Sequence, residues 1–328
     1  MGIRLDTKMR EPKYVKNTTK HTYGIYQWQH KGFPFSNALD LVGWKQSSRP
    51  SVFLLDHDLN KGKVGTSRNI IRRKYEDGAM CVLYPHSVLP EWWYGVDFLP
   101  DPKIQFRFEI ASAQVDAVKM ILPKLPTEIC GWPFSEIKPF RACSNPTKVL
   151  FASIHPPKYA PLRPEAARAN SEILSSLKKL RNNYNIRIRY LRKLEAQGLE
   201  QVPGIEYKQG LPDGSTKDIE WADVVIAEQT FLWLSAALGK PTIGILQTVC
   251  PRGNNLKSKR TDDWEKWWHL VRHPLSHNEG NMKNLIEQAS KYEPKEWKRW
   301  NIGKKMEPEN ISNTIERYLR KYKGAIRG

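Results

Sequence analysis

Short apolar runs alternate with amphipathic stretches along most of the chain, which predicts strands alternating with helices. Strands are predicted at residues 21–28, 51–55, 79–84, 127–130, 148–154, 186–191, 205–207, 223–227 and 241–246. Helices are predicted at residues 37–44, 66–75, 112–122, 164–179, 192–197, 215–221, 229–238, 281–292 and 311–323. Because parallel strands need crossover connections, this alternation predicts an α/β fold with parallel sheets.

The alternation occurs in both halves of the chain, which predicts two Rossmann-like parallel-sheet domains facing each other across a cleft. We expect a basic arm at 1–20, an N-terminal domain at 21–145 and a C-terminal domain at 146–302. A basic helix within 303–328 is expected to pack back on the N-terminal domain. Ligands of such sheets bind at the carboxyl ends of the strands, so functional residues are sought there.

The composition limits the class of protein. Of the 328 residues, 40% are hydrophobic, enough for a real core, which excludes a disordered chain. The four cysteines form no C-x-x-C pair, so they indicate buried thiols of a reduced compartment and no structural zinc. No apolar run is long enough for a transmembrane helix, and the start is too polar for a secretory signal. The expected location is the cytoplasm.

The chain carries 53 Lys and Arg residues against 34 Asp and Glu residues, a net charge of +19. Such an excess suits nucleic acid, an anionic membrane face or a phosphorylated substrate, although solubility alone is also an explanation. The basic stretches proposed to contact nucleic acid are Arg68, Arg72, Arg73, Lys74, Arg252, Lys257, Lys259 and Arg260. Aromatic residues follow some of them, as at Trp264 and Trp267.

Polar residues at strand ends are the candidates for chemistry in the second half. Glu228, Gln229 and Thr230 follow the buried strand 223–227 and open a helix, whose exposed N–H groups bind anions such as phosphate. An ordinary capped helix would have the same pattern. His155 follows the strand 148–154, where a phosphate contact is plausible and a purely structural histidine is the alternative.

Two groups in the first half are candidates for a general base. Asp56 and Asp58, with His57 between them, follow the strand 51–55, and His86 follows the strand 79–84. Carboxylates and imidazoles at such positions can accept a proton from an attacking hydroxyl. The acidic pair would equally suit a solvated loop or a helix cap.

Several of these motifs together resemble the GT-B glycosyltransferases and their relatives, the sugar-nucleotide 2-epimerases and glycerophosphotransferases. The similar features are the His155-Pro156 loop, the helix containing Asn170, the run 222–241 ending in Gly-Lys-Pro, and Gly131-Trp132-Pro133. This chain lacks the glycines that relatives often carry in the turn before the donor-binding helix.

The resemblance implies a nucleotide-sugar donor bound by the C-terminal domain. It implies that Gln229, Thr230 and the helix N-terminus hold the diphosphate, that His155 contacts phosphate, and that Glu228 binds the ribose hydroxyls. Ser235 stands near where relatives carry an acidic ribose-binding residue. No metal is implied for the fold, and a bound Mg or Mn ion would help the diphosphate leave.

Charge and resemblance together predict the acceptor. The chain resembles phage enzymes that place a sugar on 5-hydroxymethylated pyrimidines in DNA, because a polyanionic acceptor explains the charge. We expect a monomer that uses UDP-glucose, flips the modified base of double-stranded DNA into the cleft, and works in the host cytoplasm if phage-encoded. Trp92 and Trp93 are candidates to fill the gap or stack on the base, unless they pack in the core.

Two alternatives stay open at this point. One is a cell-envelope glycosyl- or glycerophosphotransferase held on an anionic membrane face by its basic residues. The other is a non-catalytic DNA-binding protein on a GT-B-like scaffold. The sequence decides neither the sugar, the modified base nor whether the anomeric configuration is inverted or retained, and a retaining reaction would need no dedicated base.

Overall fold

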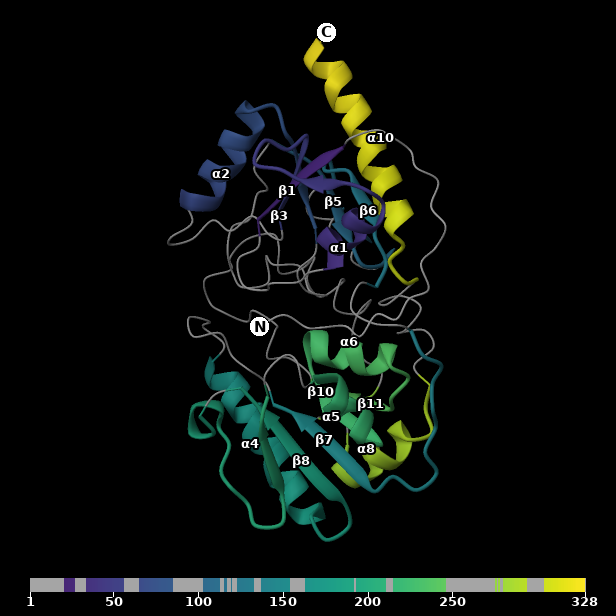
Figure 1. Cartoon of the computed structure of the whole chain (residues 1–328). Helices are drawn as coiled ribbons and strands as arrows, with labels where there is room; N and C mark the ends of the chain where they lie inside the picture. Colours follow the sequence, from purple (N-terminus) through teal and green to yellow (C-terminus); the bar gives the residue numbers. More distant parts are fainter. Residues whose placement is uncertain are drawn as a thin grey trace. The chain divides into compact units, whose positions relative to one another are not determined.

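The computed structural model describes a defined set of residues: 21–26, 34–55, 65–84, 103–112, 115–116, 119, 123–132, 137–153, 163–191, 193–210, 215–245, 275, 277, 280–293 and 304–327. The chain forms two compact units. Unit 1 combines the N-terminal part of the chain up to residue 134 with residues 304–328, and unit 2 is essentially residues 135–303. Each unit is built on one parallel sheet (Figure 1).

Unit 1 contains a six-stranded parallel sheet with the strand order β2-β1-β3-β4-β5-β6. Its strands are β1 (Thr22–Tyr26), β2 (Lys45–Gln46), β3 (Val52–Leu55), β4 (Met80–Leu83), β5 (Ile104–Glu109) and β6 (Thr127–Ile129). Its main helices are α1 (Pro34–Leu41), α2 (Gly65–Glu76) and α10 (Pro308–Arg327). β3 and β4 are buried at every position, as their unbroken apolar sequences predict.

The sequence did not predict β5, because charged residues interrupt its apolar positions. Phe106 and Phe108 lie in the core, and between and after them Arg107 and Glu109 are also buried. The two charged side chains form an ion pair with each other, which offsets part of the cost of burying each charge. An irregularity in the pairing of β4 with β5 lies beside Cys81.

Helix α10 packs on unit 1 although it lies at the far end of the sequence. The ring of Tyr318 stacks on Phe106 with centroids 4.1 Å apart, and the indole Nε1 of Trp44 donates to Ser312 Oγ at 2.8 Å. Arg317 Nη2 pairs with Glu128 Oε1 at 2.6 Å. The phenol of Tyr318 also donates to this carboxylate, and burial together with Glu128 raises the pKa of Tyr318 to about 12.

Unit 2 contains a five-stranded parallel sheet with the strand order β11-β10-β7-β8-β9. Its strands are β7 (Lys148–Ala152), β8 (Asn185–Tyr190), β9 (Glu206–Gln209), β10 (Val224–Ala227) and β11 (Thr242–Gly244). Its helices are α4 (Arg163–Leu180), the 3-10 turn η2 (Glu195–Gln197), α5 (Ser215–Trp221), α6 (Gln229–Ala237) and α8 (Met282–Ala289). The two parallel α/β sheets are the fold class that the alternation predicts.

Residues 137–143 join unit 2 through backbone hydrogen bonds, whereas the sequence places the domain boundary at residue 145. Lys138 N donates to Ala237 O at 2.6 Å, and Arg141 N donates to Gly239 O at 2.9 Å. Gly239 has φ +74°, and a Cβ there would lie 2.0 Å from Pro139 O. The glycine of the Gly-Lys-Pro motif is therefore required by the close approach of this segment.

The residues of unit 1 on either side of residues 135–303 pair with each other. Trp132 forms an isolated parallel bridge with Lys305. Trp132 N donates to Lys304 O at 2.6 Å, and Met306 N donates to Trp132 O at 3.0 Å. Trp132 is completely buried, and Gly131 before it has φ +85° with Lys304 O 2.6 Å from where a Cβ would lie. This explains the glycine of the Gly-x-Pro motif.

Candidate functional site

The strand order of unit 2 identifies where a ligand would bind. The chain builds β7, β8 and β9 in one direction and then returns to place β10 on the other side of β7. In parallel sheets with such an order, ligands bind in a crevice at the carboxyl ends of the two strands where the order reverses, here β7 and β10, beside the loops that follow them. The two strands pair directly, with Ile226 opposite Phe151. These loops carry the two groups of residues that the sequence singles out in this half, His155 and Glu228 to Thr230.

The helix that follows β10 begins at this crevice. Glu228 is extended, with φ −123° and ψ 170°, and serves as the N-cap residue of α6. Its side chain is partly exposed and makes no capping bond, while Leu232 N donates to its carbonyl oxygen at 3.2 Å. The backbone of Gln229 and Thr230 forms the first helical positions, where N–H groups have no partner within the helix. Their side chains lie outside the described residues.

The core holds α6 in place. Leu232, Trp233, Ala236 and Ala237 are each at most 6% exposed, which anchors the helix on the sheet. A rigid helix keeps its N-terminal amides aimed at one position, as anion binding requires. Ser235 is the exception among the predicted donor-site residues. It is fully buried and its hydroxyl donates to Phe231 O one turn earlier, so its role in binding ribose is withdrawn.

The end of β7 is held by a chain of polar side chains. Ser153 Oγ donates to Arg189 O at 3.0 Å, and Gln197 Nε2 donates to Ser153 Oγ at 2.8 Å. Asn170 Nδ2, in α4, donates to Gln197 O at 2.8 Å. The asparagine noticed in the sequence is thus buried and helps to fix the exit of β7. His155 itself lies outside the described residues.

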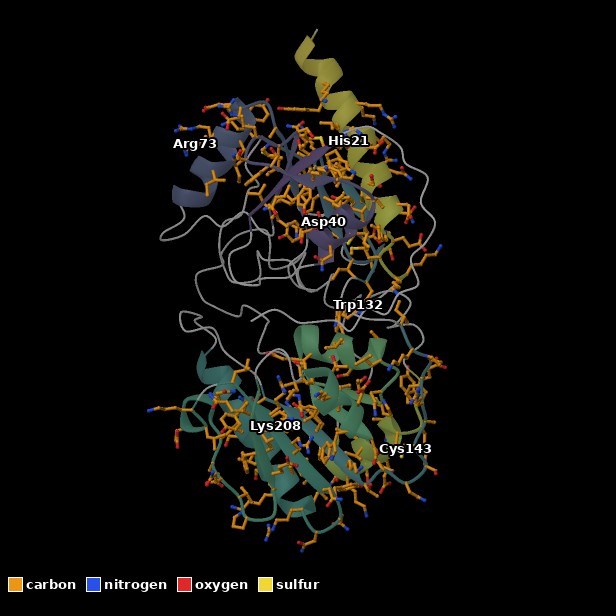
Figure 2. All side chains as sticks on the ribbon, in the orientation of Figure 1. His21, Asp40, Arg73, Trp132, Cys143 and Lys208 are labelled. Atoms are coloured by element: carbon orange, nitrogen blue, oxygen red, sulfur yellow. The ribbon has the colours of Figure 1, made fainter. Side chains whose placement is uncertain are left out.

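A buried cluster of charges lies beside the start of α6, and the sequence analysis missed it. Asp218 of α5 is completely buried and forms ion pairs with Arg187, Arg189 and Lys208 (Lys208 is labelled in Figure 2). The Arg189 guanidinium carbon lies 5.8 Å from the ring centroid of Phe231, in the first turn of α6. The sequence feature that could have indicated this cluster is the Ile-Arg-Ile-Arg alternation of β8. It puts the two arginines on the face of the strand opposite the apolar core.

The sheet of unit 1 has its own crossing point. The order β2-β1-β3 means that the chain reverses direction after β2, so the crevice lies between the carboxyl ends of β1 and β3. Asp56, His57 and Asp58 follow β3, and His86 follows the neighbouring β4, but all four lie outside the described residues. Their roles as candidate bases remain proposals.

The predicted DNA-contacting residues of α2 lie away from that crevice. Helix α2 runs from the carboxyl end of β3 to the start of β4, so its last turn lies at the opposite, amino edge of the sheet. Arg72 is exposed and lies 3.8 Å from Glu76, and Arg73 is exposed (Figure 2). Lys74 Nζ donates to Ser48 O at 2.7 Å. These three side chains therefore lie away from the carboxyl end of the sheet.

The remaining predicted positions are not described. The side chain of Arg68 and the residues Trp92, Trp93, Arg252, Lys257, Lys259 and Arg260 lie outside the described residues. Within the described residues, no three His, Cys, Asp or Glu side chains are placed to share a metal ion. In the same part of the chain, no helix combines the length and apolar character needed to cross a membrane.

His277 is a second residue that the sequence analysis missed. It pairs with the end of β11, with His277 N donating to Gly244 O at 3.0 Å. Burial lowers the pKa of its imidazole below the usual value, and Glu172 offsets part of this effect. No motif surrounds it in the sequence, so only the fold could reveal its burial.

The lowered pKa of His277 predicts a pH dependence of stability. The unfolded chain binds a proton at His277 more readily than the folded chain, so the stability is fully present above about pH 6.5 and is lost as the pH falls through the folded pKa. Urea unfolding of wild type and His277→Gln between pH 5 and 8 should show that the difference in unfolding free energy shrinks in acid. Parallel pH profiles for the two proteins would contradict this prediction.

Comparison with known proteins gives structural likeness only. No protein-family model matches the sequence, and no curated protein matches it. Solved structures resemble the fold, among them a mutant of TarM from S. aureus in complex with Fondaparinux, alpha-GlcNAc-glycerol and UDP. It has a TM-score of 0.47 and 14% identity, over 83% of this chain and 56% of TarM. The chain thus spans just over half the length of that protein.

Two further structures have a similar degree of likeness. A putative UDP-N-acetylglucosamine 2-epimerase from Listeria monocytogenes has a TM-score of 0.48 and 10% identity, covering 88% of this chain and 78% of its own. The glycosyltransferase SnogD from Streptomyces nogalater has a TM-score of 0.44 and 11% identity, covering 92% of this chain and 100% of its own. Values this low assign neither an activity nor a substrate to this chain.

Proposed function

We propose that this protein is a GT-B-type glycosyltransferase that moves a sugar, most simply glucose from UDP-glucose, to a 5-hydroxymethylated pyrimidine in double-stranded DNA. One observation supports the proposal: the strand order of unit 2 puts the carboxyl ends of β7 and β10 side by side, which is where ligands of such sheets bind. The partly exposed Glu228 and the N-terminus of α6 lie at the end of β10, and His155 follows β7 in the sequence.

The proposed donor site matches the chemistry of a nucleoside diphosphate. The free N–H groups at the start of α6 offer hydrogen bonds to a diphosphate, and the helix dipole favours its negative charge. The buried Arg189, one of the cations paired with Asp218, adds positive potential beside this turn because it lies near Phe231. Glu228 would accept hydrogen bonds from the ribose hydroxyls, and Gln229 and Thr230 would add donors.

The proposed reaction is a displacement at C1 of the sugar. The hydroxymethyl oxygen of the flipped base attacks C1, a new C1–O bond forms, and the bond from C1 to the diphosphate oxygen breaks. The proton of the hydroxyl passes to a base of unit 1, with Asp56, Asp58 and His86 as candidates. The electron pair of the broken bond leaves on UDP, whose growing charge the α6 N-terminus stabilises. Mg or Mn would assist this departure if it binds the diphosphate.

The acceptor is supported by charge. A net charge of +19 is far more than a small neutral acceptor requires, whereas duplex DNA is bound mainly through its phosphates. The test offers radiolabelled UDP-glucose with unmodified, hydroxymethylcytosine-containing and hydroxymethyluracil-containing duplex DNA. Label on one modified DNA would establish the reaction and identify the base. No label on any DNA, with UDP-glucose still bound, would exclude the DNA acceptor. DNA binding without any binding of a sugar nucleotide would favour a non-catalytic protein.

The donor site gives a prediction for Glu228. Glu228→Gln removes the charge but keeps the size, and Glu228→Ala removes the whole carboxylate. We expect Glu228→Ala to weaken binding of UDP by roughly tenfold, because one charged hydrogen bond is worth about 1.5–3 kcal/mol. Isothermal titration with UDP measures the loss. Glu206→Ala, which removes a half-exposed carboxylate on β9, is the control and should bind UDP normally. Unchanged binding by Glu228→Ala would remove Glu228 from the site.

A further inference from the structure

The amino edge of the sheet in unit 1 gathers cations from separate parts of the chain. In a parallel sheet every strand starts at this edge, and the helices that precede strands end there. Helix α2 ends here, just before β4. The loop before β3 also lies here, and Lys74 Nζ ties it to α2 by donating to Ser48 O at 2.7 Å. This loop carries the exposed Arg49.

Helix α10 brings a third group of cations to the same edge. It starts beside Trp132, at the carboxyl end of β6, and runs back along the sheet. Its later turns reach the start of β4, because Tyr322 Oη donates to Ala79 O at 3.4 Å and the Tyr322 ring lies 6.1 Å from that of Tyr75 in α2. Arg320, Lys321 and Lys323 on these turns are all exposed.

These residues form what we call the amino-edge surface: Arg49, Arg72, Arg73, Arg320, Lys321 and Lys323. The acidic residues near it are largely engaged, since Asp40 accepts from Tyr23 Oη, Glu76 lies 3.8 Å from Arg72 and Glu316 lies 3.7 Å from His21. Asp77 is exposed at the end of α2.

The helix dipole does not explain these charges. Cations near the end of a helix stabilise it, but the effect is limited to the last turn. Helix α10 continues to Arg327, so Arg320 and Lys321 stand more than one turn before its end. Arg49 belongs to no helix. A positive surface built from a loop and two helices fits a polyanion better than a capping function.

The packing of α10 decides which of two polyanionic partners, a membrane or a nucleic acid, the amino-edge surface fits. An amphipathic helix holds a membrane by inserting its apolar face between the lipids. Among the side chains of α10 that the structure describes, Ile311, Ile315 and Leu319 are at most 3% exposed, because they pack in unit 1. Along the turns from Ile311 to Lys323, the charged face is therefore the one left for a partner. The surface therefore fits the phosphate backbone of a nucleic acid, which is bound without insertion.

We propose that the amino-edge surface is a second DNA-binding site, which holds the duplex backbone away from the nucleotide that reacts. The four central strands of unit 1, β1, β3, β4 and β5, have four to six residues, which puts the amino edge about 13–20 Å from the carboxyl edge. A short duplex at the catalytic crevice would not reach it, whereas a longer one that bends or wraps would touch both. The second contact would raise the local concentration of acceptor at the crevice. The catalytic part of this inference rests on the proposed function, whereas DNA binding itself does not.

The first test measures binding of unmodified DNA without donor. The variant Arg320→Gln/Lys321→Gln/Lys323→Gln is compared with Lys178→Gln/Lys179→Gln/Arg181→Gln, which removes the same charge around the end of α4 in unit 2. Fluorescence anisotropy with a duplex of about 30 base pairs is recorded over a range of salt concentrations. We expect the α10 variant to bind at least tenfold more weakly and to lose roughly 0.9 of the salt slope for each contact removed. The α4 variant should stay within about twofold of wild type.

The second test uses the length of the acceptor. On long hydroxymethylated duplexes the α10 variant should raise KM and leave kcat unchanged, while on duplexes of about 10 base pairs it should match wild type. Weaker DNA binding by this variant, with no sugar transfer by wild type, would support the surface and remove the proposed function. Normal DNA binding by the α10 variant, or equal losses in both variants, would overturn the inference. Loss of binding to phosphatidylserine vesicles, with DNA binding intact, would also overturn it and indicate a membrane.

Discussion

Asp218→Asn is expected to lower the free energy of unfolding by about 3–5 kcal/mol, the cost of leaving buried charges without their partner. Asp218 is completely buried and pairs with Arg187, Arg189 and Lys208. Arg189 is only 5% exposed, so water cannot replace the lost carboxylate. Asparagine keeps the size of the side chain but supplies no charge. Urea unfolding monitored by circular dichroism measures the difference.

The matched control for this prediction is Glu206→Gln. Glu206 pairs with Arg187 at 2.9 Å, but its side chain is 52% exposed. Solvent screens such a pair, so its loss should cost less than about 1 kcal/mol. Equal effects of the two variants would show that burial does not determine the strength of the Asp218 cluster. Weaker UDP binding by a still folded Asp218→Asn would link the cluster to the donor site.

Gly239→Ala is expected to destabilise unit 2 by about 3 kcal/mol or more, because it combines backbone strain with a clash. Gly239 has φ +74°, a conformation that alanine rarely adopts. The new Cβ would also lie 2.0 Å from Pro139 O and 2.9 Å from Pro139 C, both backbone atoms. The segment that contains Pro139 would have to leave unit 2. Thermal unfolding measures the loss.

Gly78→Ala separates the two causes. Gly78 has φ +85°, but a Cβ there would have nothing within 4 Å. Only the strain of the left-handed conformation remains, so we expect a loss of about 1 kcal/mol. If Gly239→Ala costs no more than Gly78→Ala, the close approach of Pro139 to Gly239 is wrong.

The sequence predicts best those strands in which every residue is apolar and every residue is buried. Strands β3, β4 and β10 are buried on both faces and have unbroken apolar sequences. β5 was missed because its Arg107 and Glu109 are polar in the sequence but paired in the core. An ion pair between strand residues two apart has no signature in a hydrophobic pattern, since the pattern reports the cost of burial and not the partner that offsets it.

Only those parts of the candidate site that directly follow a strand could be predicted from the sequence. Glu228 and the start of α6 follow directly from a buried strand that turns into a helix. Ser235 was assigned by resemblance, and the helix buries it instead. The position of Arg73 could not be predicted either. The sequence shows that α2 is a basic helix, but it does not show at which edge of the sheet the last turn of α2 lies. That edge is decided by the strand order, which depends on long-range pairing.

The bridge between Trp132 and Lys305 closes unit 1 around residues 135–303, which form nearly all of unit 2. Trp132, near the point of exit, and Lys305, near the point of return, pair directly, so the gap to be closed is one bridge spacing, about 4.8 Å. Replacing the residues between these two positions by a short turn of a few residues would therefore leave unit 1 as one chain. Residues 135–303 likewise form one continuous stretch that can be produced alone. The two halves of the proposed reaction, binding of the sugar nucleotide and binding of DNA, can therefore be assayed on separate polypeptides.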